Sequence, residues 1–226
     1  MASLKSQKIS NLLLHILGLV SFTSSFTYLF SHTTKLTNSF GGPFQQLTIL
    51  CLLFSTLTFA LGFLVDITNS ALILRIRAWL LTFITPMELL LTIAYWSLLA
   101  YDPALIIDTR TAGKPPLLAD MGFHLFPAIF LVLDSILTPP IAISKRTALI
   151  VSAGLVGTYW GWIVLCESRN GFWVYPIVGK LGNLERFIAL TLWVGVLWVV
   201  WRLVESFKRW VQSGMNETSR VGRKTK

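Results

Sequence analysis

Residues 44–65 read FQQLTILCLLFSTLTFALGFLV, a stretch without a charged side chain. An α-helix needs about 20 predominantly apolar residues to cross the hydrocarbon core of a bilayer, so this stretch predicts a membrane span. Five further stretches reach this length or come close to it. The six predicted spans lie near residues 10–30, 44–65, 78–101, 118–138, 147–166 and 186–207. The sequence therefore predicts an all-α, polytopic membrane protein with six transmembrane helices.

The composition of the chain agrees with a membrane protein. Hydrophobic residues make up 54% and charged residues 13%, and the mean hydropathy is +0.68. Soluble domains carry roughly a quarter charged residues, so this composition indicates a protein of the bilayer. The fourth span is the least apolar because it contains His124 and Asp134. Cys51 and Cys166 both fall inside spans and indicate little about the redox compartment.

The net charge of +9 is distributed unevenly between the two sides of the predicted bundle. One side carries the larger set of cations: Lys5, Lys8, Arg75, Arg77, Lys145, Arg146, Arg202, Lys208, Arg209, Arg220, Arg223, Lys224 and Lys226. The other side carries Lys35, Arg110, Lys114, Arg169, Lys180 and Arg186. Cytosolic loops are enriched in Lys and Arg, so both termini are predicted to lie in the cytosol. This pattern indicates a membrane topology and excludes nucleic acid as a partner.

The chain is predicted to divide into a single membrane domain, residues 1–207, and a basic cytosolic tail, residues 208–226, that faces anionic lipid. The final residues, Arg223-Lys224-Thr225-Lys226, carry basic side chains third and fourth from the end of the sequence. This arrangement resembles a dibasic retrieval signal. It predicts an integral membrane protein of the endoplasmic reticulum or another endomembrane.

Thr48 and His124 are predicted to lie at similar depths on the non-cytosolic side. Gly42 can cap span two and Pro43 suits its first helical position, which puts Thr48 about 7 Å along the helix. Asp120 is a plausible cap for span four, with His124 about 6 Å further along. The sequence has no phosphate-binding loop and no HExxH, GxSxG or clustered Cys/His motif. Any chemistry must therefore come from isolated side chains that converge.

A threonine and a histidine at matching depth have the properties of a nucleophile and its base. A threonine hydroxyl attacks poorly until an adjacent base takes its proton, and neutral imidazole is the usual base near pH 7. A helix N-terminus would keep His124 neutral and would favour alkoxide character on Thr48. The unpaired N–H groups of both first turns are candidate donors to a developing oxyanion.

Other interpretations of the polar residues stay open from sequence alone. Thr48 can be a helix hydroxyl that bonds back to its own backbone, and His124 can be structural. His32 is either a rival base or an interfacial loop residue, and His15 is predicted to lie away from the pair. Cys51, one turn below Thr48, is either a packing residue or the nucleophile itself.

Buried acids and one loop add further candidates. Asp134 points roughly 80° away from His124, ten residues on along the helix, and is either cavity-lining or structural. Glu88 lies at comparable depth and needs a partner, a water-filled cavity or a proton. Residues 171–176 offer an aromatic lid at the interface. The substrate-pocket or oxyanion candidates are Gly41, Gly42, Gln45, Trp173, Tyr175 and Asp134.

The chain resembles the androgen-induced (FAR-17a/androgen-induced-like) family of small multispan proteins. The resemblance runs from about residue 30 to residue 207. It is carried by Gly41-Gly42, Leu47-Thr48, Val65-Asp66, Ala100-Tyr101-Asp102, His124 with Asp134, and Trp173-Val174-Tyr175-Pro176. It implies transmembrane hydrolases of fatty acid esters of hydroxy fatty acids, with the nucleophile at Thr48 and its base at His124. Phe123, Leu125, Phe126 and Glu88 depart from the pattern, which puts the acyl-chain preference in doubt.

The predicted function is hydrolysis of lipid esters within the bilayer by Thr48 and His124, with no metal or cofactor. The substrate, a fatty acid ester of a hydroxy fatty acid, and membrane lipids are the expected partners. The alternative is a non-enzymatic transporter or lipid-binding protein in which His124, Asp134 and Glu88 line a path.

Overall fold

The computed structural model describes residues 2–107 and 114–224, and the side chains of residues 8–107 and 114–214. Every secondary-structure element in these ranges is helical. The α-helices are α1 (Ala2–Ser31), α2 (Leu47–Thr68), α3 (Ala71–Tyr101), α4 (Leu117–His124), α5 (Phe126–Leu137), α6 (Lys145–Asn170), α7 (Pro176–Lys180) and α8 (Asn183–Lys224). Two 3₁₀ turns, η1 (Gly42–Gln45) and η2 (Pro103–Leu105), precede α2 and follow α3.

Six helical segments of the described chain are long and apolar enough to cross a membrane, which confirms the predicted number. They are Lys8–Ser31, Leu47–Thr68, Ala71–Tyr101, Leu117–Leu137, Lys145–Asn170 and Asn183–Gly214. The third begins seven residues before the predicted start at 78, so the position of Arg77 was predicted wrongly. Arg77 is a buried residue of α3 and not a loop residue.

The fourth span consists of two helices, α4 and α5, where the sequence predicted one. The break falls at Leu125, whose φ of −132° and ψ of −52° are not helical. Pro127 explains the break, because proline has no backbone N–H to donate to residue 123 and its ring clashes with the preceding turn. His124 is consequently the last residue of α4 and not a first-turn residue of a long helix.

The turn before α2 also differs from the prediction. Gly41 and Gly42 adopt positive φ values of 85° and 55°, and Gly41 is the N-cap of η1. A Cβ atom on Gly41 would lie 2.8 Å from the Sγ of Cys166, so both backbone conformation and space favour glycine there. Helix α2 therefore begins at Leu47, with Gln46 as its N-cap, and Thr48 is its second residue.

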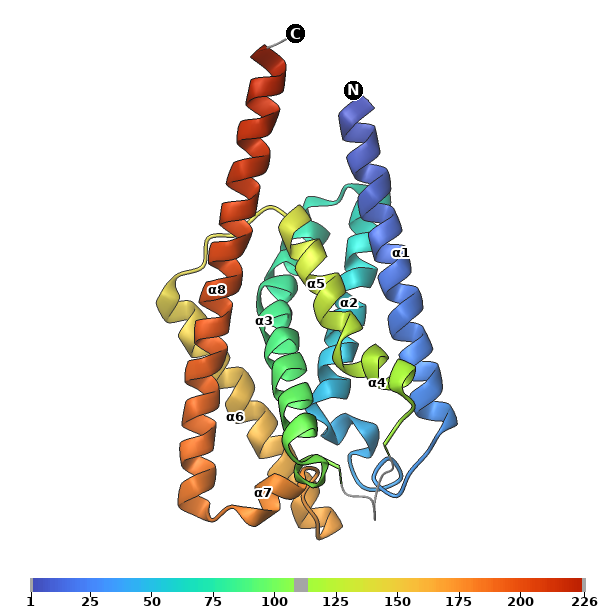
Figure 1. The fold of residues 1–226 in the computed structure, drawn as a ribbon, viewed down its shortest axis with the longest axis vertical. Helices are drawn as coiled ribbons and strands as arrows, with labels where there is room; N and C mark the ends of the chain where they lie inside the picture. The colour runs from blue at the N-terminus through green and yellow to red at the C-terminus, as the bar shows by residue number, and fades with distance from the viewer. Residues whose placement is uncertain (1, 108–113, 225–226) are drawn as a thin grey trace.

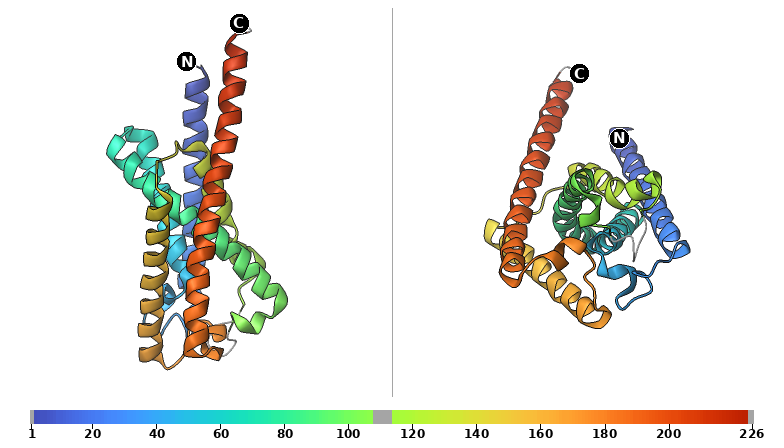
Figure 2. Two further views of the ribbon diagram at one scale, coloured as in Figure 1. Left: turned by 90° about the vertical axis from the view of Figure 1, so that its left-hand side faces the viewer. Right: turned by 60° about the horizontal axis from the view of Figure 1, so that its bottom comes forward.

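Helices α1, α2, α3 and α5 pack together, and α6 and α8 form an antiparallel pair whose α8 contacts this group through α3 and α5 (Figure 1). Figure 2 shows α3 and α5 between α8 on one side and α1 on the other. Side chains from five helices, α1 to α5, build the main buried cluster, which includes Phe22, Leu52, Leu81, Phe123 and Leu131. Many large apolar side chains remain exposed, as expected for helices that face lipid.

Both termini lie at the same end of the bundle (Figure 1). The opposite end holds η1, the start of α4 and α7 (Figure 1). We call the first the terminal end and the second the loop end. The short α2–α3 connection at the terminal end is set by Asn69, which ends α2 in the left-handed conformation at φ 53°. The assignment of the terminal end to the cytosol, and the division into a membrane domain and a tail at residue 208, stay predictions.

Candidate functional site

The hydroxyl of Thr48 lacks the backbone hydrogen bond that several other threonines in the spans make, a property that it shares with the buried hydroxyl of Thr92 on α3. Thr56, Thr58, Thr82 and Thr85 each donate to the carbonyl four residues earlier, at 2.7 Å. The corresponding carbonyl for Thr48 belongs to Phe44 in η1, and it accepts from Trp162 Nε1 at 2.9 Å. Thr48 is buried, and its hydroxyl makes no hydrogen bond within the described chain. It is therefore not a back-bonded helix hydroxyl.

The first turn of α2 leaves one backbone donor without a partner. The N–H of Leu47 donates to the hydroxyl of Tyr175 at 2.9 Å. The N–H groups of Ile49 and Leu50 both donate to the carbonyl of Gln46. The N–H of Thr48 itself makes no hydrogen bond to any residue that the structure describes. The backbone N–H and the side-chain hydroxyl of Thr48 therefore both lack a hydrogen-bond partner among the described residues, at the N-terminus of α2.

Aromatic residues of α6 and α7 hold this turn in place. The Tyr159 hydroxyl donates to the Gln45 carbonyl at 2.9 Å and lies 3.4 Å from the Tyr175 hydroxyl. Burial raises the pKa of the Tyr175 phenol, which keeps that group protonated and neutral at pH 7. Trp173 stacks on Trp160, with ring centroids 5.6 Å apart. The residues of the expected aromatic lid are thus packed against α6, and Tyr175 reaches α2 directly.

Gln45 has a structural position. Its side chain is fully buried, and its Nε2 lies within 3.0 Å of three acceptors: the carbonyls of Leu36 and Gly42 and the hydroxyl of Ser39. Its Oε1 accepts from Asn170 Nδ2 at 3.4 Å. Because an amide carries only two donor hydrogens, this side chain is fully committed to the loop. It has no donor left for an oxyanion.

His124 lies in a polar cluster with Asp120 and Tyr95. The imidazole Nδ1 is 3.1 Å from Asp120 Oδ1 and 3.1 Å from the Asp120 carbonyl oxygen. The Tyr95 ring lies flat on the imidazole, with centroids 3.4 Å apart, and its hydroxyl donates to Asp120 Oδ1 at 2.6 Å. Asp120 is fully buried and does not cap α4, whose N-cap is Pro116. The prediction that Asp120 is a cap was therefore wrong.

Thr48 and His124 both lie toward the loop end, on helices α2 and α4, which contact each other. Ile49 and Phe123, their neighbours in the chain, belong to the same buried apolar cluster. No hydrogen bond joins Thr48 to His124 in the described chain. His124 Nε2 has no hydrogen-bond partner among the described residues, so this nitrogen is open.

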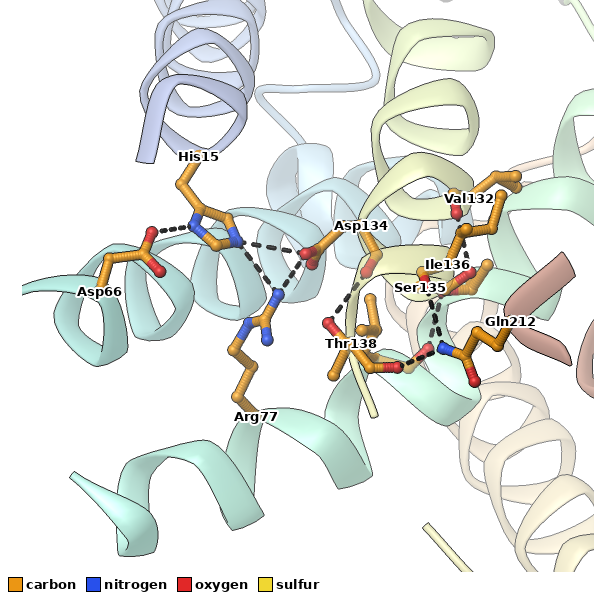
Figure 3. Close-up of polar contacts among 11 residues, drawn as sticks. His15, Asp66, Arg77, Val132, Asp134, Ser135, Ile136, Thr138 and Gln212 are labelled. Atoms are coloured by element: carbon orange, nitrogen blue, oxygen red, sulfur yellow. Dashed lines mark hydrogen bonds and ion pairs between the residues drawn. The ribbon is translucent and has the colours of Figure 1, made fainter. Parts of the chain in front are cut away.

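Asp134 does not join this site. It lies toward the terminal end, where Arg77 donates to its Oδ1 and His15 Nε2 lies 3.2 Å from the same oxygen (Figure 3). His15 Nδ1 is 2.6 Å from Asp66 Oδ2, and all four side chains are buried. We call these four residues the His15 network. Asp66 is consequently an internal ion-pair partner and not the snorkelling or capping residue that its place at a span end predicted.

The remaining candidates occupy separate places. Glu88 is buried and its Oε1 lies 2.9 Å from the Ser55 hydroxyl. His32 is exposed at the end of α1, where its Nδ1 lies 3.0 Å from the Tyr28 carbonyl. Cys51 is a buried free thiol. No group of three or more His, Cys, Asp or Glu side chains in the described ranges is arranged to hold a metal ion.

Sequence reasoning missed the partners of His15 and His124, although one of the two histidines has a local signal. Asp120 and His124 are spaced i, i+4, the separation at which helix side chains meet. No such signal exists for His15: its closeness to Gly62, where a Cβ atom would lie 2.4 Å from His15 Nε2, is visible only in the structure. The stacking of Tyr95 on His124 has no comparable local signal, because it depends on how α3 is rotated against α4.

The sequence was compared with known proteins. Residues 10–209 match the family described as FAR-17a/AIG1-like protein. A UPF0641 membrane protein of Schizosaccharomyces pombe is 27% identical over 194 residues, which cover 84% of this chain and 86% of the relative. The androgen-dependent TFPI-regulating protein of Mesocricetus auratus is 26% identical over 66% of this chain and 68% of its own. The human protein of that name is 24% identical over 78% and 80%.

No solved structure matches the chain significantly. The match to the family covers most of the six spans and includes Thr48, Asp120 and His124. The chain therefore belongs to the FAR-17a/AIG1-like family.

Proposed function

We propose that this protein is an integral-membrane hydrolase of lipid esters, with Thr48 as nucleophile and His124 as general base. The observation that carries the proposal is the Thr48 hydroxyl, which is buried in the first turn of α2, beside its own free N–H, and lacks the back-bond that Thr56 and Thr58 of the same helix make. Membership of the family supports it, because the resemblance of this chain to that family implies a threonine–histidine hydrolase.

The reaction follows from the groups present. His124 Nε2 takes the hydroxyl proton as Thr48 Oγ1 attacks the ester carbonyl carbon and the carbonyl π bond becomes an oxyanion. The free N–H of Thr48 is the donor for that oxyanion, in place of the committed amide of Gln45. Collapse breaks the bond to the alcohol oxygen, which takes the proton back from His124. Water then attacks the acyl-threonine with the same base and releases the fatty acid.

The substrate proposed is a fatty acid ester of a hydroxy fatty acid, as the family resemblance implies. Such an ester partitions into the bilayer and can approach Thr48 between helices, since Thr48 lies in the first turn of a span. Because Thr48 and His124 are not hydrogen-bonded in the free protein, binding must bring the two groups together, and catalytic hydrogen bonds often tighten only on binding.

The proposed location is an endomembrane such as the endoplasmic reticulum, with the termini in the cytosol and the site facing the other side. The basic residues that suggest this location, 223–226, lie beyond the described side chains. The site itself lies toward the loop end, opposite the termini (Figure 1). Oligomeric state plays no part in the proposed mechanism.

The test is hydrolysis of a long-chain fatty acid ester of a hydroxy fatty acid by purified protein, with Thr48→Ala and Thr56→Ala compared side by side. Thr56 lies on the same helix and is back-bonded, so its loss controls for removing a span hydroxyl. We expect Thr48→Ala to lose hydrolysis and Thr56→Ala to keep it. Full activity in Thr48→Ala would contradict the nucleophile. A wild type that moves a solute in proteoliposomes and cleaves no ester would favour the transporter alternative.

A further inference from the structure

We propose that Asp120 is a positioning residue that holds His124 as the tautomer protonated on Nδ1, and that Tyr95 holds Asp120 in place. The kinetic consequence of this arrangement rests on the proposed function. The assignment of the His124 tautomer does not depend on the proposed function.

The first step is the proton on Nδ1. This nitrogen is 3.1 Å from both the side-chain Oδ1 and the backbone carbonyl of Asp120. A backbone carbonyl only accepts hydrogen bonds, so the bond it shares with the imidazole requires a hydrogen on Nδ1. In a neutral imidazole the lone pair is then on Nε2, which is the nitrogen open to a reacting group.

The second step is the orientation of the ring and of the carboxylate. Tyr95 reaches from α3 and covers one face of the imidazole, with an interplanar angle of 5°. Its hydroxyl donates to the same Oδ1 that faces His124. One side chain thus fixes the plane of the base and the rotamer of the acid. A stacked ring also hinders the 180° flip that would exchange Nδ1 and Nε2.

The third step is the charge. Asp120 is fully buried, and its Oδ2 has no hydrogen-bond partner among the described residues. A buried carboxylate with one oxygen left without a hydrogen bond is costly in free energy. A carboxylate at this position would stabilise the imidazolium that forms when Nε2 takes the Thr48 proton.

The break between α4 and α5 decides where His124 lies on its helix. Because α4 ends at His124, the imidazole stands at a helix end and its Nδ1 folds back over the preceding turn to Asp120. The three residues Thr48, His124 and Asp120 then have the roles of nucleophile, base and orienting acid.

The direct test is long-range ¹⁵N–¹H NMR of the full chain labelled on histidine, at a pH where the imidazoles are neutral. The chain has only three histidines, so loss of a signal in His124→Gln assigns His124. We expect wild-type His124 to be protonated on Nδ1 alone and Asp120→Asn to populate the Nε2-protonated form in part, because the new amide can donate to Nδ1 and only the retained backbone carbonyl then favours a hydrogen there. An Nε2-protonated wild type, or an unchanged tautomer in Asp120→Asn, would overturn the proposal.

Kinetics give the second test. We expect Asp120→Asn to lower kcat by about 100-fold or more with KM within about threefold, and Asp120→Glu to recover part of that loss. Asp102→Asn is the matched control, because Asp102 caps η2 and lies outside this cluster. Equal losses in Asp120→Asn and Asp102→Asn would overturn the positioning role.

Tyr95→Phe keeps the proposal falsifiable if Asp120→Asn does not fold. It retains the stacked ring and removes only the hydroxyl, so we expect a kcat lower by about threefold to tenfold and a mixed His124 tautomer. Wild-type kcat and tautomer in this variant would overturn the role of Tyr95. If wild-type protein cleaves no ester, the proposed function fails, and the NMR result still decides whether Asp120 sets the tautomer.

Discussion

His15, which is buried, and His124, which is partly buried, lie at opposite ends of the bundle and use their ring nitrogens differently. At the loop end, His124 engages Asp120 through Nδ1 and leaves Nε2 open. At the terminal end, both nitrogens of His15 face partners: Asp66 at 2.6 Å on one side, and Asp134 at 3.2 Å on the other. Arg77 Nη2 lies 3.0 Å from His15 Nε2 as well. An imidazole with an open nitrogen can exchange a proton with a substrate, whereas one bonded on both sides is held in a fixed network.

The His15 network joins four helices, because His15, Asp66, Arg77 and Asp134 come from α1, α2, α3 and α5 (Figure 3). The network pairs the carboxylates of Asp66 and Asp134 with the His15 imidazole and the Arg77 guanidinium. Buried charges are tolerated only in such pairings, and removing one partner leaves an uncompensated charge. The comparison therefore predicts that substitutions at the loop end affect catalysis and those at the terminal end affect stability.

The largest effect on catalysis is expected from substitution of His124, the histidine whose Nε2 has no partner among the described residues. We expect His124→Gln to lower kcat/KM by on the order of 10³-fold or more, which corresponds to about 4 kcal/mol of transition-state stabilisation. Its thermal stability in detergent should stay near that of wild type. The measurement is steady-state hydrolysis beside a melting curve. If His124→Gln unfolds, or if it keeps wild-type activity, His124 does not have the catalytic role that separates it from the structural His15.

The next effect is expected in the His15 network. We expect His15→Ala to lower the free energy of unfolding by about 3 kcal/mol, because Asp66 loses its partner and Asp134 keeps only Arg77. Hydrolysis per folded molecule should be unchanged. Denaturant titration in mixed micelles measures the first quantity, and activity normalised to monodisperse protein measures the second. Loss of kcat with unchanged stability would assign His15 to catalysis instead.

A smaller effect is expected from the glycine beside His15. A methyl group on Gly62 would lie 2.4 Å from His15 Nε2, so Gly62→Ala should cost about 1–3 kcal/mol of stability through overpacking. The matched control is Gly154→Ala on α6, where an added Cβ meets nothing within 4 Å. If the two variants have the same melting temperature, α2 does not pack against His15 as closely as the structure shows.

The smallest effect is expected at the turn before Thr48. We expect Tyr175→Phe to cost about 1 kcal/mol, because the N–H of Leu47 loses its acceptor, and to lower kcat less than tenfold. Tyr101→Phe, at an exposed side chain, is the control. Stability and kcat are read from the same preparations, and equal values for the two variants would mean that Tyr175 does not secure α2.

The sequence predicted the six spans well because length and hydropathy decide whether a helix crosses a membrane. It also placed Thr48 and His124 at one end, since that follows from counting spans. The break at Leu125 was missed even though Pro127 is visible in the sequence. The partners of His15, and Tyr95 beside His124, could not be predicted, because they depend on the rotation of each helix about its axis.

Adduct mapping by mass spectrometry tests the central claim most directly. Purified protein is treated with a fluorophosphonate probe, digested and searched for the modified residue. The account predicts an adduct on Thr48, absent in Thr48→Ala and strongly reduced in His124→Gln. The nearest competing nucleophile is Cys51, a buried free thiol on the same helix one turn away. An adduct on Cys51, or labelling that persists in Thr48→Ala, would contradict Thr48 as the nucleophile.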